Sequence, residues 1–150
     1  MKRKLIVEVT AFLLMLLFLY ASVSKWLDFR TFTNEINNQP FPNWLTPWII
    51  WIVPPLEVLI TLALMFERTR TAGFYASLIL MSAFSIYTGA VLLHFFDYIP
   101  CSCGGIIKDL SWSEHLILNL FFVAISITAI LLRRNRYSKD GPDKPVIIAG

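Results

Sequence analysis

The chain has 150 residues, of which 57% are hydrophobic and 15% are charged, and its formal net charge is +3. This apolar fraction exceeds what a soluble domain of that length needs for its core, so the surplus must face lipid. The basic residues gather at the ends of apolar runs, at 2–4, 68–70 and 133–136. This placement argues against nucleic acid as a partner and indicates a polytopic membrane protein.

Four apolar runs predict an all-α, four-helix membrane bundle over residues 1–132. We interpret the first, Leu5–Tyr20, as an uncleaved span, although its basic start and the following Ala21–Ser24 also fit a secretory signal peptide. The other spans are expected at Leu45–Phe66, Thr71–Phe96 and Leu116–Leu132. Residues 133–150 are polar and then rich in Pro and Gly, which predicts a flexible cytoplasmic tail.

The first connection, Ser24–Asn43, has helical spacing in its middle. Its apolar residues recur every three or four positions, which predicts a short amphipathic helix on the membrane surface, ended by prolines. These residues are Trp26, Phe29, Phe32 and Ile36. A solvated loop remains open as the alternative.

The second span contains Pro54-Pro55, which we expect to kink it, and Glu57 about halfway along. An ionisable group at that depth costs several kcal/mol unless it is neutral, paired or facing a cavity, so Glu57 is a candidate functional residue. The alternative is a protonated Glu57 that donates a hydrogen bond to a carbonyl freed by the prolines and serves packing alone.

The third span is rich in small residues, which predicts close helix packing, and His94 lies near its end. Ser111 and Glu114 have the spacing of a capping box at the start of the fourth helix. Farther along, His115, Asn119 and Ser126 recur at intervals of four and seven, so we expect one face of this helix to carry them into the bundle.

Both cysteines, Cys101 and Cys103, lie in the stretch Pro100–Gly105 between the third and fourth spans. Two thiols one residue apart form a disulfide, a mixed disulfide or a shared metal site at little additional ordering cost. A disulfide in so small a ring is strained and easily reduced, which favours exchange over a structural role. The alternative is that the two residues are merely small side chains of a loop.

The basic clusters alternate with connections that contain few basic residues, so both termini are expected in the cytoplasm. The cysteines then face outward, into a compartment that permits disulfides. All five tryptophans of the chain fall toward the same outer side, as interfacial anchors do.

Three elements together resemble the MauE/DoxX-like redox-associated membrane proteins over roughly Leu5–Leu132. They are Ser24-Lys25 with Asp28 and Phe32, then Pro55-x-Glu57, and finally Pro100-Cys101-Ser102-Cys103-Gly104-Gly105. The resemblance implies a bacterial inner-membrane protein that acts in periplasmic disulfide formation beside a thioredoxin-like partner. Its four-helix layout is similar to those of DsbB and vitamin K epoxide reductase. Those enzymes carry two cysteine pairs, whereas this chain has one.

We therefore predict that Cys101 and Cys103 exchange disulfides with a periplasmic thioredoxin-like protein, with a thiolate as the attacking group. His94 or His115 is expected to activate a cysteine or move its proton, and the amino end of the fourth helix favours a nearby thiolate. A quinone against the bundle would take the electrons, with Glu57 as proton acceptor.

Two other classes of function remain open. In the first, Cys101, Cys103, His94 and His115 supply two sulfurs and two nitrogens to zinc or copper in a metal-binding or carrier protein. In the second, the chain is a non-catalytic membrane subunit or assembly factor.

Overall fold

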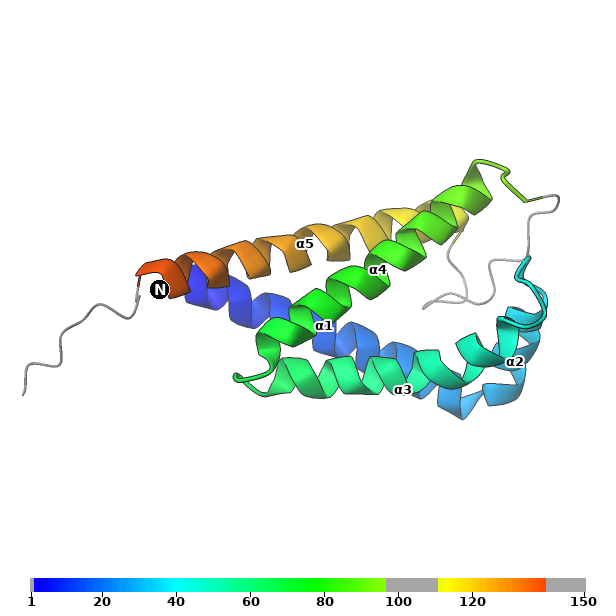
Figure 1. The fold of residues 1–150 in the computed structure, drawn as a ribbon, viewed down its shortest axis with the longest axis horizontal. Helices are drawn as coiled ribbons and strands as arrows, with labels where there is room; N and C mark the ends of the chain where they lie inside the picture. Colours follow the sequence, from blue (N-terminus) through cyan, green and yellow to red (C-terminus); the bar gives the residue numbers. More distant parts are fainter. Residues whose placement is uncertain (1, 97–110, 140–150) are drawn as a thin grey trace, which may run out of the picture.

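The computed structural model describes residues 2–96 and 111–139, and within these ranges the chain forms five helices (Figure 1). They are α1 (Lys2–Leu27), α2 (Phe29–Asn37), α3 (Thr46–Met65), α4 (Arg70–Leu92) and α5 (Trp112–Lys139). All but α2 are long and apolar enough to cross a membrane. The protein is thus an all-α, multi-pass membrane protein, as predicted.

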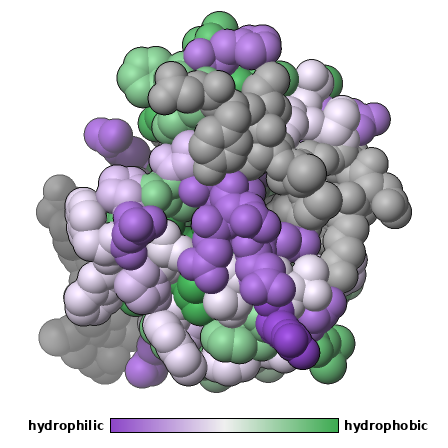
Figure 2. All heavy atoms as spheres, turned by 90° about the vertical axis from the view of Figure 1, so that its right-hand side faces the viewer, coloured by the Kyte–Doolittle hydropathy of each residue, from purple (hydrophilic) through white to green (hydrophobic). Residues whose placement is uncertain are grey.

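The four long helices alternate in direction, and α1 packs mainly on α3 while α4 packs mainly on α5 (Figure 1). The start of α1 therefore lies at the same end of the bundle as the end of α5. At the opposite end, which we call the α2 end, α1 and α4 finish and α3 and α5 begin. Figure 2 looks onto the α2 end and shows hydrophilic side chains gathered over its centre.

Two helices are longer than the sequence predicted. α1 runs on through Ser24 and Lys25, because Ala21 and Ser22 are buried in the bundle and the Ser22 hydroxyl donates a hydrogen bond to the Pro54 carbonyl (3.2 Å). α5 runs to Lys139, so the first seven residues of the predicted tail are helical. The first Gly and Pro after the fourth span come only at positions 141 and 142, and nothing earlier interrupts the helix.

The short helix predicted between the first two spans is present as α2, but it begins at Phe29, and Trp26 belongs to the end of α1 instead. The Asp28 side chain caps α2 by accepting a hydrogen bond from the Thr31 backbone N–H (3.2 Å). Phe32 is the buried residue of its apolar face. This burial attaches α2 to the bundle and positions the polypeptide that leads into α3.

The core consists of apolar side chains from all four long helices, including Leu14, Phe18, Leu64, Phe74 and Phe122. α3 continues through Pro54 and Pro55 as one helix. The predicted close packing is clearest at Gly73, where an added Cβ would lie 2.9 Å from Leu64 Cγ. Large apolar residues such as Ile79, Ile86 and Ile117 are exposed, as lipid-facing side chains are.

An ion pair ties the helices together at the end opposite α2. Arg70 Nη1 donates to Glu8 Oε1 (2.8 Å), and Arg70 Nε donates to the Leu64 carbonyl (3.0 Å). Glu8, in the second turn of α1, thus has its ion-pair partner on α4.

Candidate functional site

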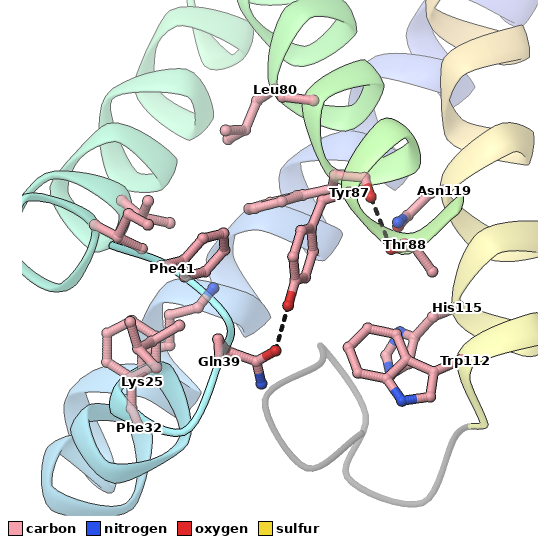
Figure 3. A pocket seen from close by; sticks show the side chains of 15 residues that line it. Lys25, Phe32, Gln39, Phe41, Leu80, Tyr87, Thr88, Trp112, His115 and Asn119 are labelled. Atoms are coloured by element: carbon pink, nitrogen blue, oxygen red, sulfur yellow. Dashed lines mark hydrogen bonds between the residues drawn. The ribbon is translucent and has the colours of Figure 1, made fainter. Parts of the chain in front are cut away.

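A cavity of about 360 Å³ lies at the α2 end of the bundle (Figure 3). Its volume is in the range of small-molecule sites, roughly 300–1,000 Å³. Every helix contributes to its wall, together with the segment between α2 and α3. The lining residues are Lys25, Phe32, Ile36, Gln39, Phe41, Ile49, Val53, Leu80, Ala83, Phe84, Tyr87, Thr88, Trp112, His115 and Asn119.

A buried ion pair stands at the wall of this cavity. Lys25 Nζ, near the end of α1, donates to Glu57 Oε1 on α3 at 2.5 Å. The Lys25 side chain is 14% exposed and that of Glu57 only 1%. Since Lys25 lines the cavity and Glu57 does not, the ammonium is the end of the pair that a ligand would meet.

Glu57 is therefore paired, and this differs from the packing alternative, in which it donates to a freed carbonyl. Its carboxylate accepts from Lys25, and within residues 2–96 and 111–139 its second oxygen, Oε2, is buried without a hydrogen-bond partner. A buried carboxylate oxygen without a partner is costly, and in structures it often marks a functional group.

The aromatic ring of Tyr87 projects into the middle of the cavity (Figure 3). Its hydroxyl donates a hydrogen bond to Gln39 Oε1. Its ring centroid lies 4.9 Å from that of Phe41, 6.0 Å from that of Phe96 and 6.1 Å from that of Trp112. Phe96 is the last residue of the range 2–96, and Trp112 is the second residue of the range 111–139. The Tyr87 ring therefore contacts one residue on each side of the gap between these ranges.

Both sequence predictions for the start of α5 are confirmed. The Ser111 backbone N–H donates to Glu114 Oε2 (2.8 Å) and the Glu114 N–H donates to Ser111 Oγ (3.4 Å), which is the reciprocal pattern of a capping box. His115, Asn119 and Ser126 are all buried on the inward face of the helix. The first two of them line the cavity.

His94, the other candidate histidine, serves as a helix cap. Its φ of 55° lies in the left-handed region, where His is tolerated better than most residues. The His94 N–H donates to the Val91 carbonyl (3.1 Å) and the Phe95 N–H to the Ala90 carbonyl (3.0 Å), as in a Schellman motif. The exposed His94 side chain is absent from the cavity lining.

Cys101 and Cys103 lie outside the described residues, so their predicted catalytic role stays a prediction, as do those of Glu57 and His115. Within the described ranges no group of three or more His, Cys, Asp or Glu residues is placed to hold a metal ion. The zinc or copper alternative depends on both cysteines and is not tested by that finding.

The sequence interpretation missed Lys25 as a site residue, because it placed this lysine in the polar connection. The sequence did contain a signal for Lys25. An ionisable Glu57 within a span needs a partner of opposite charge, and Lys25 is the first basic residue after the first apolar run. Tyr87 and Gln39 were missed too, since an isolated aromatic or amide residue has no distinctive spacing in the sequence.

Comparison with known proteins identifies the family. No curated protein and no solved structure gives a significant match to the chain. The profile of the family described as "Methylamine utilisation protein MauE" matches residues 3–132, which include all four predicted spans and the cavity. This membrane protein therefore belongs to the MauE family.

Proposed function

We propose that this protein is a thiol-disulfide redox protein of the bacterial inner membrane. Cys101 and Cys103 exchange disulfides with a periplasmic thioredoxin-like protein, and the electrons pass on to a quinone. Membership of the MauE family supports the proposal, because the residues that carry the resemblance include the cysteine pair.

The observation that carries the proposal is the double contact of Tyr87 with Phe96 and Trp112. These two residues bracket the cysteine segment. Trp112 lines the cavity, and Phe96 contacts the Tyr87 ring that projects into it. Cys101 follows Phe96 by five residues, and Cys103 precedes Trp112 by nine. The cysteine pair therefore belongs to the connection whose two flanking residues contact Tyr87 at the α2 end.

The exchange step moves two electrons and two protons. A thiolate of the reduced partner attacks the Cys101–Cys103 disulfide, a mixed disulfide forms, and the partner's second thiol resolves it. The partner leaves oxidised, and this protein holds two thiols. His115, at the first turn of α5, is the histidine that we propose to move the thiol proton, since it lines the cavity and the His94 side chain does not.

The cavity fits the quinone that would regenerate the disulfide. Its walls are mostly apolar and aromatic, and a few convergent polar side chains, among them Lys25, Gln39 and Asn119, fix an orientation. A bound quinone accepts the two electrons and two protons that two thiols release on forming a disulfide.

The basic residues support the proposed orientation. The amino terminus, the α3–α4 connection and the end of α5 share one end of the bundle and carry Lys2, Arg3, Lys4, Arg68, Arg70, Arg133, Arg134 and Arg136. By the positive-inside rule this end is cytoplasmic and the α2 end is periplasmic.

The test uses Cys101→Ser and Cys103→Ser in cells whose free thiols are trapped with acid and alkylated. In the reverse of the exchange step, one cysteine of this protein attacks the oxidised partner and the other releases it from the mixed disulfide. The variant that keeps only the attacking cysteine is therefore expected to accumulate a reducible complex with its partner on non-reducing gels. Ser102→Ala is the matched control and should accumulate none. If neither cysteine variant traps a partner and both leave the partner's redox state unchanged, the proposal is wrong. Stoichiometric zinc or copper on both thiols of purified protein would support the metal-binding alternative instead.

A further inference from the structure

The cavity at the α2 end carries polar side chains on facing walls. In Figure 3, Lys25 lies on one side with Phe32, and Asn119 lies on the other with His115. Tyr87 projects between the two sides. A ligand that satisfies both walls must therefore present a polar atom at each of two opposite edges.

We infer that this cavity binds a flat, mostly apolar ring compound with hydrogen-bond-accepting oxygens on opposite edges, and that the Lys25 ammonium contacts one of these oxygens. The inference deepens the proposed function and rests on it, since it assigns the contact made with the electron acceptor. It also assigns Glu57 to positioning rather than to proton transfer.

Structural stability does not explain a buried lysine at this place. Removing two charges from water costs about as much as their attraction returns, and a pair of apolar side chains would hold α1 against α3 equally well. An ammonium has three N–H donors, and Glu57 Oε1 accepts from one of them. Lys25 lines the cavity, so its remaining donor capacity is available to a ligand there.

Glu57 and Phe32 hold the ammonium in place. Glu57 lies behind Lys25, away from the cavity lining, and its charge balances that of the lysine. Lys25 Nζ also lies 5.8 Å from the centroid of the Phe32 ring, within the range of a cation–π contact. Glu57 does not line the cavity, so it acts on a ligand through Lys25.

The apolar side chains of the cavity favour a ligand whose main part is a flat, apolar ring. Phe41 and Tyr87 present their rings to the cavity, and Ile49, Val53 and Leu80 supply aliphatic surface. Flat rings pack well against such aromatic faces. A lipid acyl chain would fill the same apolar space, but it has no oxygen to meet Lys25. Binding of the ring compound should therefore depend on Lys25, whereas binding of a lipid acyl chain should not.

The test measures binding to the full-length protein in lipid nanodiscs, by equilibrium dialysis against empty nanodiscs. The probes are menadione and methylnaphthalene, which has the same fused rings and methyl group but no oxygens. We expect the protein to prefer menadione, and Lys25→Met to weaken menadione binding by about tenfold or more without affecting methylnaphthalene. Lys4→Met, the same change at the other end of α1, should leave both affinities unchanged.

The double variant Lys25→Glu/Glu57→Lys, in which the two charges are exchanged, is a control that separates weaker binding from a folding defect. It keeps an ion pair between α1 and α3 but turns a carboxylate toward the cavity. We expect it to unfold at a temperature close to that of the wild type and to bind menadione more weakly than Lys25→Met does. Equal binding of the two probes, or menadione binding that is indifferent to Lys25, would show an apolar or acyl-chain site and overturn the inference.

A separate variant distinguishes failure of the inference from failure of the proposed function. Cys101→Ser/Cys103→Ser removes both thiols and should bind menadione with unchanged affinity. Lysine-dependent binding in a protein that never traps a thiol partner would refute the exchange function and leave the ligand site standing.

Discussion

The Lys25–Glu57 ion pair offers the sharpest test of the structure, through Glu57→Ala. Glu57 is 1% exposed and Lys25 is 14% exposed, so the truncation leaves an ammonium buried without its counter-ion. Breaking a buried pair in this way costs about 3–5 kcal/mol of unfolding free energy. Glu57→Gln should cost less, because the amide oxygen still accepts a hydrogen bond from Lys25 although the charge remains unbalanced.

Another ion pair between helices, Arg70–Glu8, provides the matched control. Arg70 and Glu8 also join two helices, at 2.8 Å, but the Glu8 side chain is 44% exposed. Solvent screens such a pair, and Arg70 keeps its hydrogen bond to the Leu64 carbonyl when Glu8 is truncated. Glu8→Ala is therefore expected to cost about 0.2–1 kcal/mol.

Removing both charges of the buried pair completes the comparison. Lys25→Met/Glu57→Leu replaces the pair by apolar side chains of similar size, and such replacements are often neutral or stabilising. We expect its unfolding free energy to be close to that of the wild type, although Glu57→Ala alone is strongly destabilising.

The assay is reversible unfolding of the purified protein in mixed micelles, followed by far-ultraviolet circular dichroism as the denaturing detergent increases. The reasoning is refuted if Glu57→Ala loses less than about 1 kcal/mol, or no more than Glu8→Ala does. Either outcome would mean that water or lipid headgroups reach Lys25 and that the pair is not buried.

Two further predictions concern packing and orientation. Gly73→Ala should destabilise the bundle by about 1–3 kcal/mol, because the new Cβ would lie 2.9 Å from Leu64 Cγ and 3.0 Å from the Leu64 backbone nitrogen. Gly89→Ala, where nothing lies within 4 Å, should be neutral or stabilising by about 0.5–1 kcal/mol in the same unfolding assay. A membrane-impermeant thiol reagent should label Cys101 or Cys103 in intact, mildly reduced spheroplasts. Labelling only after lysis would reverse the orientation.

The sequence by itself determined the class of the protein and most of its helices. Apolar runs of spanning length leave no alternative to helices in lipid, since each backbone polar group needs a partner within its own segment. Local signals were sufficient for α2, with its cap at Asp28, and for the Ser111–Glu114 capping box. The inward face of α5 followed from periodicity, because His115, Asn119 and Ser126 share a helical stripe.

Only the tertiary structure decided which polar groups meet. Lys25 and Glu57 are 32 positions apart, Glu8 and Arg70 are 62 apart, and no local rule pairs residues across separate helices. The same holds for the ring of Tyr87, which gathers Phe41, Phe96 and Trp112 from different parts of the chain. Hydropathy determines that helices cross the membrane, but their rotation and pairing depend on side-chain packing between them. Because of that packing, Lys25, which the sequence assigned to a polar connection, lies at the end of α1 and contributes a charged side chain to the cavity wall.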